Sequence, residues 1–244
     1  MSTFTGFDHE ALAFLRDVHR HNSKEWFEGH RDIYESKLLA PFRALVDSMG
    51  MPMRQIDEFI EIRPAIGKTI SHLRRDTRFS HDKSLYRNNM WLTFKRPKKN
   101  WIDAPTYFFE FGPDWWRYGL GYYSASPTTM ELFRERLLGF QHEFQQAAKA
   151  IPEGFDVHGD SYKRQMVPEE LSSELAPWYV KKSFYIANRS ADMFPLASPK
   201  LPDTLLEGFE HLFTMYMFLV DVERMKQDRG QTQATRTPPV KAKQ

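Results

Sequence analysis

The alternation of apolar and polar positions predicts helices near both ends of the chain. Residues 8–21 place apolar side chains along one helical face, and Asp8 is suited to cap the first turn. Asn22, followed by Glu25 three residues later, resembles a capping box that opens a second helix. Residues 202–226 predict a last helix that is strongly apolar on one side.

The middle of the chain reads differently, because strand-type residues there are separated by turn signals. Segments 89–95, 106–111 and 117–124 follow one another and predict an antiparallel meander. The other predicted elements are a strand at 56–66, a helix at 127–151 capped by Ser126, a short helix at 168–179 and a strand at 180–188.

Helices on either side of a central run of strands predict an α+β fold. We expect a single domain over residues 1–227, with a central antiparallel sheet packed by the N-terminal, middle and C-terminal helices. Residues 228–244 are polar and poor in aromatic side chains, so they are predicted to form a disordered basic tail.

Composition supports a globular chain and narrows its chemistry. Of 244 residues, 41% are hydrophobic and 15% aromatic, which is enough to build a substantial core. The absence of cysteine excludes disulfides, thiolate metal ligands and cysteine nucleophiles. Neither a secretory signal nor a run of about 18 apolar residues is visible, so we expect a cytoplasmic protein without a membrane span.

Charge is distributed unevenly along the chain, although the formal net charge is only +2. The segment 63–99 carries a local net charge of +9, and the rest of the chain carries −7. Such asymmetry indicates an anionic partner, which would be a phosphate ester, a nucleic acid or an acidic protein surface.

Five of the eleven Lys and Arg residues of this segment lie in RRDTRFSHDKSLYR, residues 74–87. Arginine forks match the oxygens of phosphate and carboxylate groups, and they stay charged at any working pH. We therefore predict a site for a small phosphorylated or carboxylated ligand, with Arg75, Arg78 and Lys83 supplying positive charge and Asp76 orienting an arginine. Alternation along an extended segment predicts that Phe79 packs inward.

The same segment offers candidates for proton transfer, Asp82 and Tyr86, although their spacing assigns no roles. The nine histidines are scattered without an HExxH pair, so no metal site is predicted. Neither a glycine-rich phosphate loop nor a GxSxG elbow occurs, and no cofactor is predicted.

Two motifs together resemble the microbial family of unknown function DUF2461. The first is the RDxRF-x-x-[DN]K-x-x-Y stretch that begins at Arg75, and the second is an upstream N-x-[KR]-x-WF helix followed by Arg and Tyr. The residues matching the second motif are Asn22, Lys24, Trp26, Phe27, Arg31 and Tyr34. The resemblance implies an α+β domain but no reaction. Within our hypothesis, Asn22, Lys24, Trp26 and Arg31 would face the same cleft as the basic segment.

Two other interpretations of the basic segment remain open. In one, the basic loop 94–101 and the tail bind a nucleic acid or an acidic protein, with flanking aromatic rings available for stacking. In the other, the motif is a purely structural ion-pair network. Its charges would then pair with acidic residues such as Glu110 and Asp114 and hold the strands to the N-terminal helices.

Overall fold

The computed structural model describes residues 3–78, 81–97 and 103–236, with side chains up to residue 229. The structure combines helices with a five-stranded antiparallel sheet, which confirms the α+β prediction. The strands are β1 (Met90–Phe94), β2 (Thr106–Phe111), β3 (Trp116–Gly121), β4 (Phe155–His158) and β5 (Tyr185–Ser190). The helices are α1 (His9–His21), α2 (Lys24–Gly29), α3 (Arg31–Ile33), the π-helix η1 (Tyr34–Leu39), α4 (Ala40–Ile56), α5 (Pro127–Gly139), α6 (Gln141–Lys149), the 3₁₀ turn η2 (Ser173–Leu175), α7 (Ala176–Tyr179), the 3₁₀ turn η3 (Phe194–Ala197), α8 (Leu201–His211) and α9 (Phe213–Arg236).

The sheet has the order β1-β2-β3-β5-β4. The first three strands form the predicted meander, and β5 returns beside β3 with Leu120 opposite Ile186. Strand β4 pairs with β5 at the edge of the sheet. The sequence pattern missed β4, because a four-residue strand with only partly buried side chains gives little alternation to detect.

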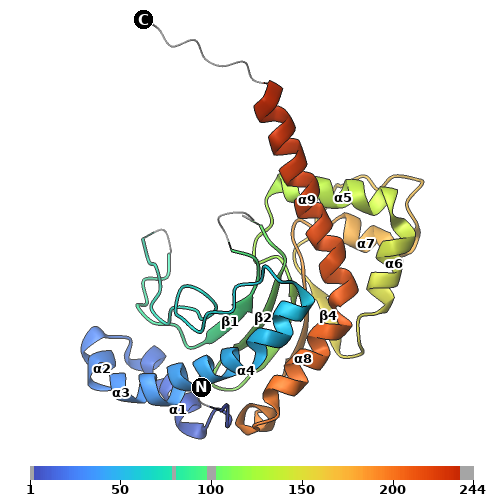
Figure 1. Ribbon diagram of the computed structural model, residues 1–244. Coiled ribbons are helices and arrows are strands. Elements are labelled where there is room, and N and C mark those ends of the chain that lie inside the picture. Colours follow the sequence, from blue (N-terminus) through green and yellow to red (C-terminus); the bar gives the residue numbers. More distant parts are fainter. Residues whose placement is uncertain (1–2, 79–80, 98–102, 237–244) are drawn as a thin grey trace, which may run out of the picture.

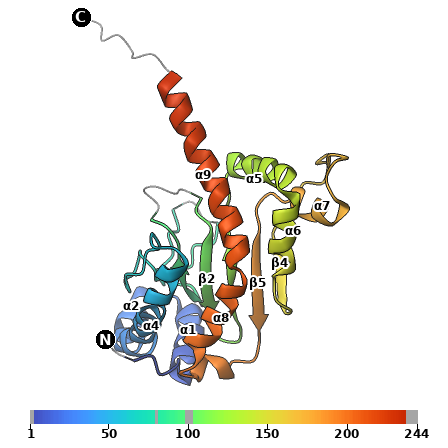
Figure 2. The ribbon, with the colours of Figure 1, turned by 45° about the vertical axis from the view of Figure 1, so that its right-hand side comes forward.

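The two faces of the sheet differ. Leu92, Phe109 and Leu120 lie on the covered face and are fully buried. Helices α4, α8 and α9 lie on this side of the sheet (Figures 1 and 2). On the opposite face, Trp91 and Phe108 are only partly buried. Helices therefore pack against one face, while the other is left for loops and cavities.

Helix starts were predicted more accurately than helix ends. Asp8 caps α1 through the Ala11 amide, and Ser126 caps α5, as predicted. The capping box at Asn22 is wrong, because Ser23 accepts the amide of Trp26 and caps α2. Asn22 instead ends α1 in a left-handed conformation with φ 43°, a backbone region that asparagine tolerates better than most residues.

Several predicted elements differ from the structure. The strand at 56–66 is wrong, because α4 runs to Ile56 and the following segment is irregular. The helix at 127–151 divides into α5 and α6, and the last helix divides into α8 and α9. Helix α9 continues to Arg236, past the predicted boundary of the tail at 228, and residues 237–244 lie outside the described part.

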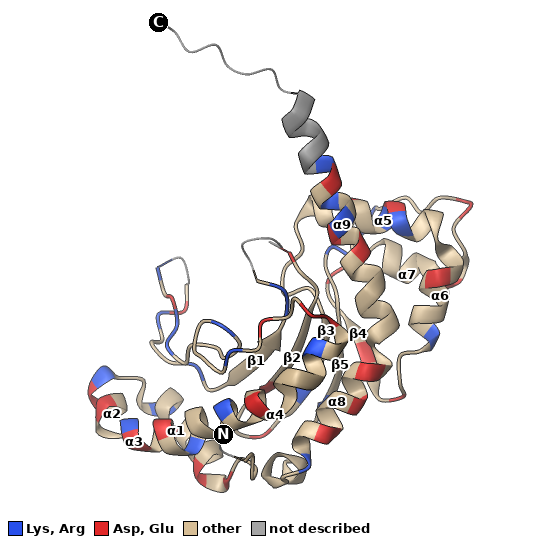
Figure 3. Ribbon diagram, in the orientation of Figure 1, with Lys and Arg blue, Asp and Glu red and all other residues tan. Residues whose placement is uncertain are grey.

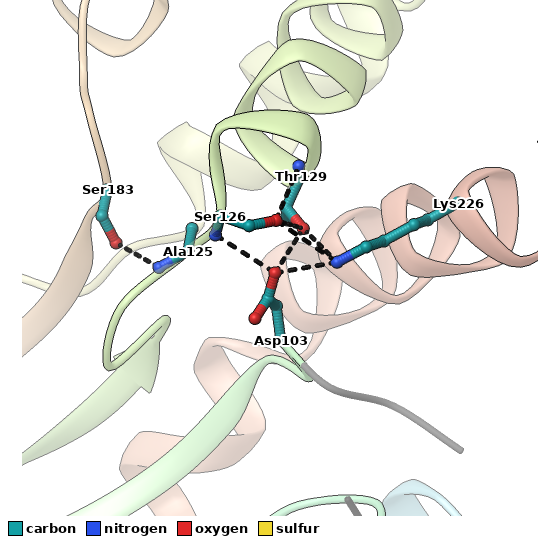
Figure 4. Close-up of polar contacts among 6 residues, drawn as sticks. All are labelled: Asp103, Ala125, Ser126, Thr129, Ser183 and Lys226. Carbon is teal, nitrogen blue, oxygen red and sulfur yellow. Dashed lines mark hydrogen bonds and ion pairs between the residues drawn. The ribbon is translucent and has the colours of Figure 1, made fainter. Parts of the chain in front are cut away.

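Two polar clusters tie the C-terminal helix to the rest of the fold. Lys226 on α9 donates to Asp103 at 2.8 Å and to the Thr129 hydroxyl at 2.7 Å (Figure 4). Nearer the start of α9, the Tyr216 hydroxyl donates to Asp57, which also binds Arg96. The helix is thereby joined to α5, to the end of α4 and to the connection between β1 and β2.

Candidate functional site

The basic segment 74–87 folds back on itself beside β1. Arg74 and Tyr86 form an isolated antiparallel β-bridge. Next to it, the Arg75 amide donates to the Leu85 carbonyl at 2.8 Å, and the Arg87 amide donates to the Leu73 carbonyl. The two legs of this turn, 73–75 and 85–87, are therefore held by backbone hydrogen bonds. The inward packing predicted for Phe79 falls outside the described residues.

Asn22 fixes this turn to the N-terminal helices. Its Oδ1 accepts the backbone amides of Leu85 and Tyr86, and its Nδ2 donates to the Tyr86 carbonyl at 3.0 Å. Three contacts from one side chain join residues 63 or 64 positions apart in the sequence. Asn22 is therefore placed to hold backbone, and it lines none of the three cavities described below.

Charged side chains of the turn pair with one another. Arg75 binds Asp82 at 2.5 Å, and the exposed pair Arg78–Asp76 has a separation of 2.7 Å. The hydrogen bond from Arg78 lowers the pKa of Asp76 to about 2. Lys83 donates to the Thr77 carbonyl at 2.9 Å. The two arginines thus meet carboxylates of the motif itself.

Glu110, which was suggested as an alternative partner of the basic segment, has other partners. Glu110 contacts Asn89 and Arg117 across the sheet. Asp82 also accepts the Ser84 amide, which, with Arg75, lowers the pKa of this candidate catalytic carboxyl.

Four residues of the N-terminal motif, Lys24, Phe27, Arg31 and Tyr34, line a small cavity of about 190 Å³ beside the basic turn. Tyr86, His72 and Arg74 line it as well. Arg31 pairs there with Glu28 and Glu35. Burial raises the pKa of Tyr86, whose ring stacks on Phe27 at 4.8 Å.

Trp26 has a different environment from the one predicted for a ligand contact. Its ring lies between His21 and His30, at centroid distances of 5.2 and 4.0 Å. The tryptophan also contacts Phe14. This stack belongs to the packing of α1 against α2, and Trp26 does not line the small cavity.

A larger groove of about 860 Å³ lies between the basic turn and the partly exposed face of the sheet. Several Lys and Arg residues lie on the loops beside β1 (Figure 3). The residues that line the groove are Gly67, Lys68, Thr69, Ile70, Ser71, His72, Arg74, Arg75, Asp76, Thr77, Arg78, Arg87, Trp91, Thr93, Lys95, Thr106 and Tyr123. Six of these are Lys or Arg and one is acidic, so the groove is strongly positive.

A second cavity of about 390 Å³ continues along the same face of the sheet. It shares Arg87, Trp91, Thr93, Thr106 and Tyr123 with the groove. Its remaining lining residues are Asn89, Phe108, Glu110, Arg117, Gly121, Tyr122 and Tyr185. The two spaces are therefore neighbours with a common wall.

Arg87 forms part of that common wall. Its Nη1 donates to the carbonyls of His72 and Arg74, at 3.0 and 3.2 Å, and its guanidinium lies 5.0 Å from the centroid of the Trp91 ring. Burial, together with the nearby Arg75, lowers the pKa of Arg87. Among the described residues, no carboxylate forms an ion pair with it. A half-buried guanidinium held by carbonyls in a basic groove favours an anion.

The floor of the second cavity carries an ordered polar row. Strand register places Trp91 opposite Glu110, and Glu110 opposite Arg117. Arg117 donates to Glu110 at 2.7 Å and to the Tyr185 hydroxyl at 2.9 Å. These side chains come from four strands, so only the register of the sheet brings them together.

The sequence prediction did not include this row or select Arg87 from the other arginines. One signal was available in β1, because the alternation in MWLTF separates Met90, Leu92 and Phe94 from Trp91 and Thr93. A tryptophan on the polar side of such a strand places a large apolar ring on a partly exposed face, which is a signal for a binding surface.

The part of the chain that the structure describes contains no group of three or more metal-ligating side chains. Within the same residues, no helix has the length and apolar character needed to span a bilayer.

Fold and site together define an α+β protein whose sheet has helices on one face and a basic, aromatic groove on the other. The chain belongs to the family described as conserved hypothetical proteins DUF2461, whose profile matches residues 10–218. The match covers both sequence motifs and the whole sheet. No curated protein matches the chain.

Proposed function

We propose that the protein binds a small phosphorylated or carboxylated ligand in the basic groove, with Arg87 as the central contact. The observation that carries this proposal is the position of Arg87. Its guanidinium is half-buried, lies on the wall of both cavities and is held by backbone carbonyls.

The surrounding charges strengthen the case for an anion. Arg75 lies close enough to lower the pKa of Arg87, so the two positive charges repel each other. An anion between them would relieve this repulsion and replace water lost on burial. Arg75 is oriented by Asp82, while Arg78 and Asp76 form the outer wall. These positions support the proposal of an anion-binding role for the segment.

Asp82 and Tyr86 remain candidates for proton transfer, although they are not placed together in this groove. Asp82 is exposed on the turn, and Tyr86 lines the smaller cavity. We therefore propose binding and do not assign a reaction. The predicted cytoplasmic location stays a prediction.

A thermal-shift screen tests the proposal. The panel contains inorganic phosphate, sugar phosphates, nucleotides and dicarboxylates, because a ligand that binds only the folded state raises the Tm. We expect at least one of these anions to stabilise the protein, and Arg87→Met to remove the shift. Arg87→Lys should retain part of it, since the charge remains but the planar fork is lost.

The control is Arg224→Met, which removes an arginine that is paired with Asp221 on α9 and lines neither cavity. It should bind as the wild type does. An equal shift in the wild type and in Arg87→Met would place the site elsewhere. No shift with any anion at millimolar concentration would contradict the proposal.

A further inference from the structure

The cavity beside the groove adds information about the kind of ligand. Resting on the proposed anion site, we infer that the 390 Å³ cavity is a subsite for a planar heteroaromatic ring, so that the ligand is a nucleoside monophosphate. The phosphate would lie at Arg87 and the base above β2 and β3. The inference depends on the shape, ring content and hydrogen-bonding groups of this cavity.

Aromatic side chains provide most of its apolar surface. Trp91, Phe108 and Tyr185 line the cavity, and Tyr123 lies on the wall that it shares with the groove. Tyr185 is held in place by His158, whose ring stacks on it at 4.9 Å. Fixed rings around a space of this size suit a flat ligand group, because binding would not require them to reorganise.

Tyr123 is the least expected of these residues. Its side chain is 99% exposed, although it follows the buried Tyr122 directly after β3. Because this ring stays in contact with water, it adds no hydrophobic stabilisation to the fold. It offers a free aromatic face on which a base can stack, and such stacking tolerates different bases.

The polar row at the floor offers both an acceptor and a donor to a ring edge. Glu110 receives one bond from Asn89 and others from Arg117, and its carboxylate oxygens retain lone pairs. The Tyr185 hydroxyl accepts from Arg117, so its own proton is left to donate. A nucleobase edge carries N–H donors next to acceptors, whereas a sugar phosphate has no such rigid edge.

The distances across the sheet fit one ligand that reaches both sites. Arg87 covers the Trp91 ring, and Trp91, Glu110 and Arg117 occupy successive strands. Because neighbouring strands are about 4.8 Å apart, the row from Trp91 to Arg117 spans roughly 10 Å. A phosphate at one end and a base at the other would occupy both cavities with a single molecule.

Calorimetric titration of the whole chain with AMP, GMP, CMP, UMP and ribose 5-phosphate tests the inference. We expect at least one nucleotide to bind ten times more tightly than ribose 5-phosphate. Tyr123→Ala should weaken that nucleotide about fivefold or more, the lower end for base stacking, and leave ribose 5-phosphate unchanged. Phe194→Ala is the matched control, because Phe194 is 80% exposed and lines neither cavity.

The outcomes separate this inference from the proposed function. Equal affinity for nucleotides and ribose 5-phosphate, lost in Arg87→Met, would reject the ring subsite and leave the anion site standing. Binding that is unchanged in Arg87→Met would reject the proposed function and the inference with it. Tight binding to single-stranded oligonucleotides with negligible affinity for mononucleotides would overturn the inference in favour of a nucleic-acid surface.

Discussion

At the scale of single residues, Asn22 has the most direct link between side-chain chemistry and the shape of the site. It combines a left-handed backbone with three hydrogen bonds to Leu85 and Tyr86. The family motif therefore contains at least one residue whose role is to position the basic turn. Its place beside the basic segment was predicted, but its action through backbone groups was not.

We predict that Asn22→Ala lowers the free energy of unfolding by about 2–3 kcal/mol, because the left-handed backbone becomes strained and buried amides lose their acceptor. Chemical denaturation measures this change. Asn22→Gly is the matched control, because glycine adopts the left-handed backbone without strain but, like alanine, lacks the side-chain hydrogen bonds. It should therefore recover only part of the stability that Asn22→Ala loses. A variant Asn22→Ala as stable as the wild type would contradict this role.

Arg87 shows why residue roles in the basic segment could not be assigned from the sequence. Arginines at 75, 78 and 87 look alike in the chain, and only the fold gives two of them carboxylate partners within the turn. Pairing depends on which side chains the turn brings together, and the sequence pattern does not contain that information.

At the scale of elements, the long helix α9 depends on a buried polar cluster beside α5. Lys226 binds Asp103 and Thr129 there (Figure 4). Glu223, one turn earlier, is only 2% exposed. Burial raises the pKa of Glu223 to about 7, and the Asp103 carboxylate adds to the rise. Its Oε1 has no hydrogen-bond partner in the described part of the chain.

This raised pKa makes stability depend on pH. The folded protein keeps Glu223 protonated up to about pH 7, whereas the unfolded chain releases the proton near its ordinary pKa of 4.5. The contribution of protonated Glu223 to the free energy of unfolding is therefore fully present below pH 4.5, and it is lost as the pH rises towards 7.

Glu223→Gln removes the titrating group with little change of shape. Between pH 5 and pH 8 the stability of the wild type should fall relative to this variant by roughly 2–3 kcal/mol. Urea unfolding at several pH values measures the difference. Parallel pH profiles for the two proteins would show that Glu223 does not titrate in this range.

Elements with long, regular patterns were predicted well from the sequence, and interrupted ones were not. The meander follows from three strand-type segments with turns between them, and the helix starts follow from their caps. The π-helix η1 ends at Leu39, shortly before Pro41, and α5 ends at Gly139, so both interruptions coincide with a residue type that disturbs a regular helix. The break between α8 and α9 falls at Leu212, where the sequence has neither glycine nor proline.

At the scale of the whole molecule, one face of the sheet belongs to the core, and the other carries the groove and the cavity in which we propose that the ligand binds. The core extends from Phe4 to Val222 and includes the covered face. The opposite face combines the basic turn, β1 and the row on β2, β3 and β5. Its composition could not be predicted without the strand order, because β5 lies more than sixty residues beyond β3 in the chain.

Salt dependence separates the small-ligand function from nucleic-acid binding. A ligand with one phosphate should lose only a modest part of its affinity between 50 and 200 mM salt. A single strand that contacts several phosphates would lose affinity in proportion to their number, with a slope of about −0.7 per phosphate on logarithmic axes. Calorimetric titrations at a series of salt concentrations measure both. A steep slope would favour the nucleic-acid interpretation.

The most direct test of the anion site is an NMR titration of the arginine Nε–H groups with inorganic phosphate, the Arg87 signal being assigned by its loss in Arg87→Lys. We predict that this signal shifts and saturates with phosphate, while the signal of Arg224 stays in place. A stationary Arg87 signal at phosphate concentrations that saturate other changes in the spectrum would contradict the assignment of Arg87 as the anion contact.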